Sequence, residues 1–213
     1  MMLQNPYLNV PTNDIDQITE TVYLGNYKGA NDLLKILKLG ITKVVSVIGE
    51  RPAPTLPNNI KQKIIPILDS PSVNVIQYFK QCLSFMDGEE KVLVHCYLGA
   101  SRSATFVIAY IMYKKRMSFL NAYNYVKTKR QIVCPNYGFM QQLLIFDKIL
   151  KQNNYNISDL DFSTIKYPSP GSACGGCCHE WHLLIIIFIK TNIHSYKYFF
   201  KFKYFFKKYY ILI

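Results

Sequence analysis

The sequence predicts an α/β domain with a central, mostly parallel sheet of four to five strands flanked by helices. Three observations support this fold class. Short apolar segments of strand type alternate with longer segments of helical periodicity between residues 15 and 150. Gly, Pro or charged residues separate these segments. Half of the 213 residues are apolar, which is enough for one packed core.

Four segments have the composition of buried strands. Each is rich in apolar residues and is bounded by turn-forming or charged residues. In chain order they are Thr21–Leu24, Lys43–Val47, Lys63–Ile67 and Val92–His95.

Five segments have the apolar spacing of helices. The first places Leu33, Leu34 and Leu37 on one face and ends before Gly40, a residue typical of helix C-termini. The third is apolar on nearly all sides, which predicts a central, buried helix. The five are Asn31–Leu39, Val73–Met86, Ser103–Lys115, Phe119–Lys127 and Tyr137–Leu150.

The chain changes character after Leu150. We expect residues 1–14 to form an N-terminal extension and residues 15–150 to form the folded domain. Residues 151–213 begin with a stretch rich in Asn, Ser, Pro and Gly, which predicts a linker. A basic, aromatic tail follows, and we expect it to be poorly ordered.

The net charge is +12, from 25 Lys and Arg against 13 Asp and Glu. No recognition motif accompanies these basic residues, so we expect no nucleic-acid partner. The longest apolar run, Leu183–Ile189, is far shorter than the roughly 20 residues of a membrane span. The N-terminus lacks the features of a secretory signal, so we expect a cytoplasmic location, with nuclear entry or peripheral membrane association as alternatives.

Two features of the tail leave alternatives open. Its Cys and His cluster is compatible with an unstructured segment, a zinc site or palmitoylation. On a helix, the Tyr and Phe residues between 198 and 210 would mostly face away from the Lys residues, which predicts weak contact with an anionic membrane surface. The same aromatic density also favours strands and aggregation. The cluster consists of Cys174, Cys177, Cys178, His179 and His182.

The segment KVLVHCYLGASRSATFVIAY, residues 91–110, carries the chemistry of the chain. A strand, a short loop and a helix follow one another there. Loop amides together with a helix N-terminus form an anion site. Gly99 permits close approach by an oxyanion, and the fork of Arg102 fits two phosphoryl oxygens. The predicted phosphate-binding residues are Tyr97, Leu98, Gly99, Ala100, Ser101 and Arg102.

Cys96 lies at the start of this loop. A helix N-terminus and a nearby guanidinium favour the thiolate form of a cysteine, which is the nucleophilic form. Ser103 can donate a hydrogen bond to the sulfur and assist its departure from a phosphocysteine. His95 can order the loop by bonding backbone groups. We therefore predict Cys96, Arg102 and Ser103 as catalytic residues and His95 as a supporting one.

The order His95-Cys96, five residues, Arg102-Ser103 resembles the signature of the cysteine-dependent protein tyrosine phosphatase superfamily. HCYLGASRS is similar to the signature of its dual-specificity branch. The segments TVYLGNYKGAND, IIPILDSPSVN and PNYGFMQQL also stand where that branch has similar segments, so the resemblance covers roughly residues 15–150. It implies a protein tyrosine phosphatase-like fold and a phosphocysteine mechanism that requires no metal and no cofactor.

The resemblance also implies a general acid on a separate loop upstream of the cysteine. Asp69 stands there, after the predicted strand KIIPIL, and would protonate the leaving group and then activate water. Asp87, Glu89 and Glu90 are the competing candidates. Asn136 corresponds to a position in the loop that supports the active site of that branch.

Loop composition narrows the expected substrate. In the superfamily that this segment resembles, the phosphoinositide branch typically has extra basic residues in the loop, and the RNA-triphosphatase branch usually reads Arg-Thr-Gly after it. Here no lysine stands between Cys96 and Arg102, and Ser103-Ala104 follow the arginine, so the resemblance disfavours phosphoinositides and RNA ends. We expect phosphorylated proteins as partners, with hydrolysis of phosphotyrosine and also of phosphoserine and phosphothreonine. Nothing resembles the kinase-docking module of related phosphatases, so an atypical member is expected.

Two other classes of function stay open at this point. The first is a phosphatase of a non-protein phosphoester, such as a phosphoinositide, a glycan or an RNA end. The second is a phospho-binding pseudophosphatase. Cys82 and Cys134 have two interpretations as well: small core residues, or redox partners of Cys96.

Overall fold

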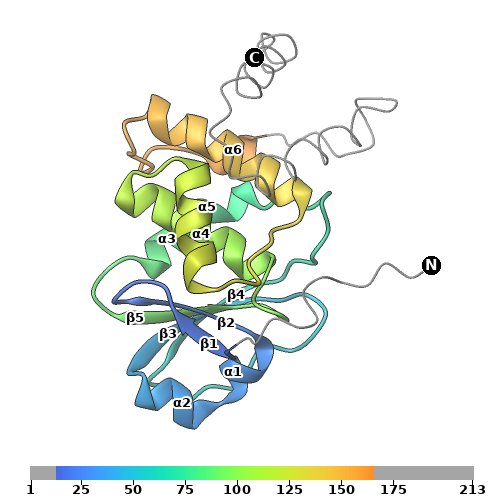
Figure 1. The fold of residues 1–213 in the computed structure, drawn as a ribbon, viewed down its shortest axis with the longest axis vertical. Helices are drawn as coiled ribbons and strands as arrows, with labels where there is room; N and C mark the ends of the chain where they lie inside the picture. The colour runs from blue at the N-terminus through green and yellow to red at the C-terminus, as the bar shows by residue number, and fades with distance from the viewer. Residues whose placement is uncertain (1–12, 166–213) are drawn as a thin grey trace, which may run out of the picture. The chain divides into compact units, whose positions relative to one another are not determined.

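A five-stranded, mostly parallel sheet organises the fold (Figure 1). The computed structural model describes residues 13–165. The strand order is β1-β2-β5-β3-β4, and only β1 runs antiparallel to its neighbour. The predicted fold class is thereby confirmed, and the short β1 is the one strand that the sequence did not predict. The strands are β1 (Ile15–Gln17), β2 (Val22–Gly25), β3 (Ile41–Val47), β4 (Lys61–Ile65) and β5 (Lys91–His95).

The central strand β5 lies between β2 and β3, and Val92, Leu93 and Val94 are fully buried. Because β2, β3 and β5 are parallel, their C-terminal ends meet at one edge of the sheet. Ligand sites of parallel α/β sheets form at that edge. The loop that starts at Cys96 is therefore surrounded by the loops that follow the neighbouring strands.

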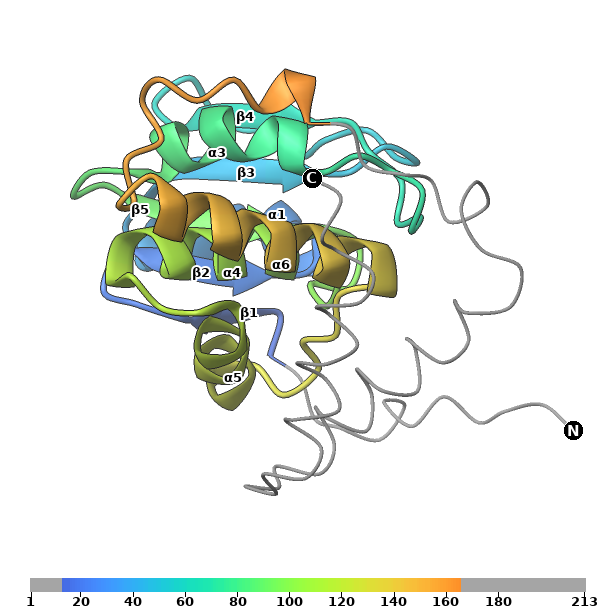
Figure 2. The same cartoon turned by 90° about the horizontal axis from the view of Figure 1, so that it is seen from above.

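Helices cover both faces of the sheet. A larger set lies on one face and a smaller set of short helices on the other (Figure 1), and seen from above α4 lies between α3 and α5 (Figure 2). Every residue of α4 from Arg102 to Met112 is buried, which confirms the predicted central helix. The larger set is α3 (Phe79–Met86), α4 (Arg102–Lys115), α5 (Phe119–Lys129) and α6 (Tyr137–Gln152), and the smaller is α1 (Tyr27–Asn31) and α2 (Leu33–Lys38). Two 3₁₀ turns, η1 (Ile76–Tyr78) and η2 (Phe162–Thr164), complete the elements.

The helix predicted over Asn31–Leu39 is wrong in its boundaries. Asp32 separates two short helices, and its carboxylate accepts a hydrogen bond from the Lys35 amide at the start of α2. This break turns α2 so that Ile36 is buried, while Leu33, Leu34 and Leu37 are 38%, 83% and 48% exposed. Gly40 has a φ of 70°, as expected for a glycine after a helix end.

The polar stretch after Leu150 packs against the domain as far as Ile165, although its composition is typical of a linker. We call residues 153–165 the C-terminal arm. Phe162 is 2% exposed, and its ring centroid lies 5.7 Å from that of Phe146 in α6. Asn74 Nδ2 donates a hydrogen bond to the Ile165 carbonyl, and Lys80 Nζ donates to that of Ser158. The arm thus covers α6 and the region around η1.

The predictions for the tail, its Cys and His cluster and its aromatic segment fall outside the described residues. Within residues 13–165, no helix has both the length and the apolar character needed to cross a bilayer. The same range contains no group of three or more Cys, His, Asp or Glu side chains placed to hold a metal ion.

A buried glutamine joins α6 to the segment that follows Asp69. Gln142 Oε1 accepts hydrogen bonds from the amides of Val75 and Ile76, at 2.6 and 3.0 Å. Its Nε2 donates to the carbonyl of Val73 at 2.8 Å. The side chain is fully buried, so water cannot replace these bonds.

Gln142→Ala should lower the free energy of unfolding by about 2–4 kcal/mol, because it leaves two buried amides without a partner and opens a cavity. In a domain of this size the loss corresponds to a fall in Tm of roughly 5–10 °C. Gln81→Ala, at an exposed position of α3, is the control and should stay within about 0.5 kcal/mol of wild type in urea unfolding. Equal stability of the two variants would contradict this role of Gln142.

Candidate active site

The loop between β5 and α4, residues 96–101, is held by its carbonyl groups. Four consecutive carbonyls accept hydrogen bonds from groups outside the loop, and two of these bonds come from one arginine. The carbonyl of Tyr97 accepts from the Tyr27 amide (3.0 Å), Leu98 from Arg130 Nη2 (3.0 Å), Gly99 from Arg130 Nε (2.9 Å) and Ala100 from the Cys134 amide (2.8 Å).

This arrangement determines where the amides of the loop point. A trans peptide is planar, so each carbonyl and the next N–H point in opposite directions. With four carbonyls bonded outward, the amides of Leu98, Gly99, Ala100 and Ser101 turn inward. Gly99 has a φ of 70°, and a Cβ there would lie 2.4 Å from the Gly25 carbonyl oxygen. We call these four inward amides the nest. The outward hydrogen bonds of the carbonyls orient the amides as the predicted phosphate site requires.

Arg130 is the main support of this nest, and the sequence did not indicate its role. Its side chain is 1% exposed, and its Nη1 donates to Asp16 Oδ2 at 2.6 Å and to the Asn13 carbonyl at 2.7 Å. The carboxylate of Asp16 compensates the buried charge, which would otherwise be costly. Arg130 thus fastens the loop to the N-terminal part of the domain.

The sulfur of Cys96 lies on the inner side of the nest. The residue is 1% exposed, and its Sγ accepts hydrogen bonds from the Gly99 amide (3.2 Å) and from Ser103 Oγ (3.1 Å). Both donors stabilise a negative charge on sulfur. The structure brings Cys96 and Ser103 together as the sequence predicts.

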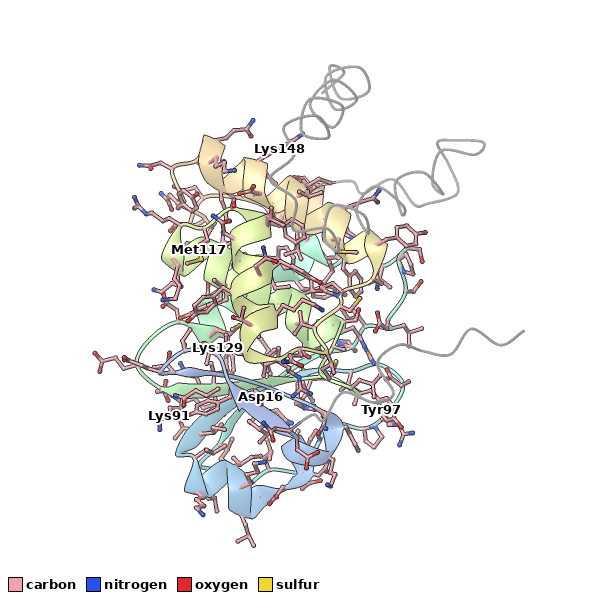
Figure 3. The ribbon with its side chains drawn as sticks, in the orientation of Figure 1. Asp16, Lys91, Tyr97, Met117, Lys129 and Lys148 are labelled. Carbon is pink, nitrogen blue, oxygen red and sulfur yellow. The ribbon has the colours of Figure 1, made fainter. Side chains whose placement is uncertain are left out.

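Figure 3 labels the two residues that bracket this part of the chain. Lys91 lies at the start of β5, and Tyr97 lies just beyond the end of β5, at the opposite end of the sheet.

The first turn of α4 is open to an anion. Ser101 is the N-cap residue, yet its side chain makes no capping bond to the helix. Its hydroxyl donates to Asp69 instead, at 2.7 Å. Helix amides without a capping side chain, together with the helix dipole, attract a negatively charged group.

Arg102 is oriented by Glu50, which lies just beyond β3. Nη1 and Nη2 of the guanidinium donate to the two carboxylate oxygens of Glu50, at 2.5 and 2.7 Å. The Arg102 side chain is 5% exposed, and its buried Nε has no hydrogen-bond partner among the described residues. The edge formed by Nε and the second hydrogen of Nη2 therefore remains available for two oxygens of a phosphate.

This pair shifts both pKa values. Hydrogen bonding from Arg102 lowers the pKa of Glu50 to about 2. Burial is the largest effect and opposes the charge of Arg102, but the hydrogen bonds to Glu50 together with the attraction to Cys96, Glu50 and Asp69 outweigh it, and the pKa of Arg102 is raised. Glu50 is thus ionised at neutral pH and holds a guanidinium that stays charged.

The ion pair predicts a specific dependence of stability on pH. Because the pKa of Glu50 is depressed in the folded state, its stabilisation is full above pH 4.5 and is lost as the pH falls through about 2. Since Glu50 is about one-third exposed, solvent screening reduces the contribution to about 1 kcal/mol. Glu50→Gln should therefore be less stable than wild type by that amount at pH 7, and the difference should shrink below pH 4.

Urea unfolding between pH 2 and pH 7 measures this difference. Glu89→Gln is the control, because Glu89 is exposed and has no ion pair within the described part of the chain. A gap between wild type and Glu50→Gln that stays constant down to pH 2 would contradict the assignment.

Asp69 reaches the site from the loop after β4. Its Oδ1 accepts hydrogen bonds from Ser101 Oγ (2.7 Å) and Asn136 Nδ2 (2.8 Å), and its Oδ2 lies 3.9 Å from Arg102 Nε. The Asn136 amide cannot be reversed, because its Oδ1 accepts from the Phe139 amide at the start of α6. Both bonds therefore occupy Oδ1, and Oδ2 is the oxygen left to carry a proton.

The other candidate acids lie elsewhere. Asp87 pairs with Lys114, and Glu90 pairs with Lys43 and Lys61. Like Glu89, they precede β5, whereas Cys96 follows it. The strand separates them from Cys96 by about 17 Å.

His95 lies behind the loop. It is fully buried, and its Nε2 is 2.8 Å from Ser46 Oγ in β3. Burial lowers the pKa of His95 to about 4, so the imidazole is neutral at pH 7. Ser46 Oγ accepts from Gln62 Nε2, so its own proton can point to His95. This contact joins the end of β5 to β3 directly before the loop, and the loop-supporting role of His95 stays a prediction.

The two other described cysteines differ in their surroundings. Cys82 in α3 is fully buried beside the sulfur of Met86, and burial raises the pKa of its thiol, which makes it a poor nucleophile. Cys134 is partly exposed, and its amide supports the loop through Ala100. The packing of Cys82 agrees with its interpretation as a core residue.

Comparison with known proteins gives consistent matches. The family model described as "Dual specificity phosphatase, catalytic domain" matches residues 22–149. A probable dual specificity protein phosphatase of Dictyostelium discoideum is 40% identical over 147 residues, which are 68% of this chain and 37% of that protein. Dual specificity protein phosphatase 1 of Arabidopsis thaliana is 34% identical over 159 residues, 73% of this chain and 75% of that protein. The chain thus spans little more than a third of the first relative and three quarters of the second.

Among solved structures, the crystal structure of DUSP15 is similar, with a TM-score of 0.62 and 34% identity over 66% of this chain and 92% of that one. This chain therefore resembles that structure in fold as well as in sequence. The range matched by the family model includes the loop at Cys96, the loop at Asp69 and the start of α6.

Proposed function

Because the chain belongs to the dual specificity phosphatase family, we propose that it is a cysteine-dependent protein phosphatase for phosphotyrosine and for phosphoserine and phosphothreonine. One observation carries this proposal. A buried sulfur, four inward amides, the free edge of Arg102 and one carboxylate oxygen of Asp69 converge at the C-terminal end of β5.

In the first step, Cys96 Sγ attacks phosphorus and the bond to the leaving oxygen breaks. The inward amides and Arg102 bind the other three oxygens, whose charge they stabilise in the transition state. Asp69 Oδ2 gives its proton to the leaving oxygen, so the product is a neutral tyrosine, serine or threonine hydroxyl. A phosphocysteine remains on the enzyme.

In the second step, Asp69 Oδ2 accepts a proton from water while the water oxygen attacks phosphorus. The bond from phosphorus to sulfur breaks, and inorganic phosphate leaves. Ser103 Oγ, at 3.1 Å from Sγ, stabilises the departing thiolate by donating a hydrogen bond. The cycle returns every group to its starting state without a metal or a cofactor.

Two features support a protein substrate. The loop carries no lysine that would meet the additional phosphates of a phosphoinositide. Tyr97 and Leu98 are 43% and 61% exposed, which offers an apolar and aromatic surface beside the nucleophile. Such a surface fits the side chains around a phosphorylated residue better than a sugar headgroup.

Reducing surroundings such as the cytoplasm suit an enzyme with a free thiol nucleophile.

Phosphate release by the full chain in excess chelator tests the proposal. The substrates are a phosphotyrosine peptide, a phosphothreonine peptide and a phosphoinositide, each at equal concentration. We expect turnover of both peptides. Activity on the phosphoinositide alone would replace this function with lipid hydrolysis, and binding of phosphopeptide without turnover would indicate a pseudophosphatase.

A further inference from the structure

Arg51 is held beside the mouth of the active site by two aromatic rings. Its guanidinium carbon lies 4.7 Å from the ring centroid of Tyr97 and 5.9 Å from that of Tyr27. Tyr97 directly follows Cys96, and the Tyr27 amide binds the Tyr97 carbonyl at 3.0 Å. These cation–π contacts position a long side chain that would otherwise be free to turn in solvent.

The charge of Arg51 has no partner in the described protein. None of its nitrogens lies within 4.0 Å of a carboxylate oxygen of residues 13–165. Its chain neighbour Glu50 is directed at Arg102 instead, which binds both of its carboxylate oxygens. Asp69 faces other groups, since its Oδ1 binds Ser101 and Asn136 and its Oδ2 lies 3.9 Å from Arg102 Nε.

The structure therefore has an exposed, oriented guanidinium outside the pocket that binds the scissile phosphate. A guanidinium stacked on rings by its face keeps its N–H edges available for an anion. The two ring contacts hold the guanidinium next to Tyr97, the residue that follows Cys96.

We propose that Arg51 selects peptide substrates that carry a second anionic group close to the phosphorylated residue. The group is the carboxylate of Asp or Glu, or a second phosphate. This inference rests on the proposed function, and it assigns Arg51 a role in substrate selection rather than in the chemical step.

The test compares kcat/KM for matched phosphotyrosine peptides. One has alanine at the two positions on each side, a set of others has one glutamate at each of these positions, and a further set has a phosphothreonine there instead. For the full-length wild type we expect a preference of about fivefold for the best glutamate peptide over the alanine peptide, the size of one exposed ion pair. The doubly charged phosphate should give a larger preference, and both should weaken with added salt.

Arg51→Ala should reduce these ratios to near one, and Arg51→Lys should restore only part of the preference, because an ammonium lacks the planar fork. Arg116→Ala is the matched control. Arg116 also stacks on a tyrosine, at 5.7 Å from the Tyr155 ring, but it follows the far end of α4, about 21 Å along the helix axis from Arg102.

The outcome depends on the ratio of kcat/KM for a charged peptide to that for the alanine peptide. Ratios that are the same in wild type and Arg51→Ala would overturn the role of Arg51 while leaving the phosphatase proposal intact. Absence of turnover on every peptide would instead reject the proposed function. A loss of preference in Arg116→Ala equal to that in Arg51→Ala would show an effect of net charge alone and would overturn the inference.

Discussion

Cys96→Ser is expected to abolish phosphate release, with a loss of kcat on the order of 10⁴-fold or more. The serine hydroxyl stays protonated at neutral pH, whereas the sulfur is stabilised as an anion by the Gly99 amide and Ser103 Oγ. His95 is a poor base for a hydroxyl, because burial lowers its pKa to about 4 and its Nε2 lies against Ser46 Oγ behind the loop. Steady-state turnover of a phosphotyrosine peptide measures the effect.

The same variant should still bind phosphopeptide, because the inward amides and Arg102 are unchanged. Retained binding, measured by titration calorimetry, separates loss of chemistry from loss of fold. Cys82→Ser is the matched control: it replaces a buried cysteine outside the site and should lower stability while keeping kcat. Turnover by Cys96→Ser within tenfold of wild type would exclude the sulfur as the nucleophile.

Asp69→Asn is expected to reduce kcat by about 10²- to 10³-fold on phosphothreonine and phosphotyrosine peptides. The asparagine oxygen can accept the same bonds from Ser101 and Asn136, so the loop should keep its position. What the variant loses is the proton on Oδ2. The defect should therefore depend on the leaving group and be much smaller for an aryl phosphate whose phenol leaves without protonation.

This dependence distinguishes an acid from a residue that only holds the loop, since a structural defect would slow all substrates alike. Asp87→Asn is the control, because Asp87 is the competing candidate and binds Lys114 at the other end of β5. It should keep kcat within about twofold of wild type. Equal losses for all leaving groups would remove Asp69 from the acid role.

The sequence predicted the centre of the site better than its surroundings. Cys96, Arg102 and Ser103 belong to one short segment, so their juxtaposition follows from a single strand-loop-helix unit. Asp69 required the resemblance to a family, because the contact with Ser101 joins residues 32 positions apart. Arg130, which holds the loop carbonyls, and Glu50, which orients Arg102, were not predicted.

Two physical reasons explain those omissions. Arg130 lies in a run of charged residues at the end of α5, which is typical of a solvated surface, and only the tertiary fold brings Asn13 and Asp16 to it. Glu50 carried a signal that could have been used. It follows β3, and the C-terminal ends of parallel neighbouring strands meet at one edge, so β3 places it beside the loop after β5.

The helix and linker predictions show a different limit. Leu33, Leu34 and Leu37 have the spacing of a buried stripe, but Asp32 at an N-cap interrupts the helix and turns Ile36 inward instead. The composition of residues 153–165 suggested a solvated connection, yet two apolar residues of the arm, Ile157 and Phe162, are buried, and Asn74 and Lys80 donate hydrogen bonds to its carbonyls. The local sequence pattern does not reveal that isolated apolar residues such as these are buried against the domain.

The attachment of the C-terminal arm also determines how concentrated a group joined to its end would be near the active site. The arm ends with Ile165 bonded to Asn74, which is five residues from Asp69 along the chain. Five extended residues span at most about 18 Å, so a group joined just beyond Ile165 starts within roughly 25 Å of Asp69. On a short flexible linker, such a group experiences the active site at an effective concentration of the order of millimolar. A phosphorylated segment tethered there would therefore compete with substrates in solution even if its intrinsic affinity were weak.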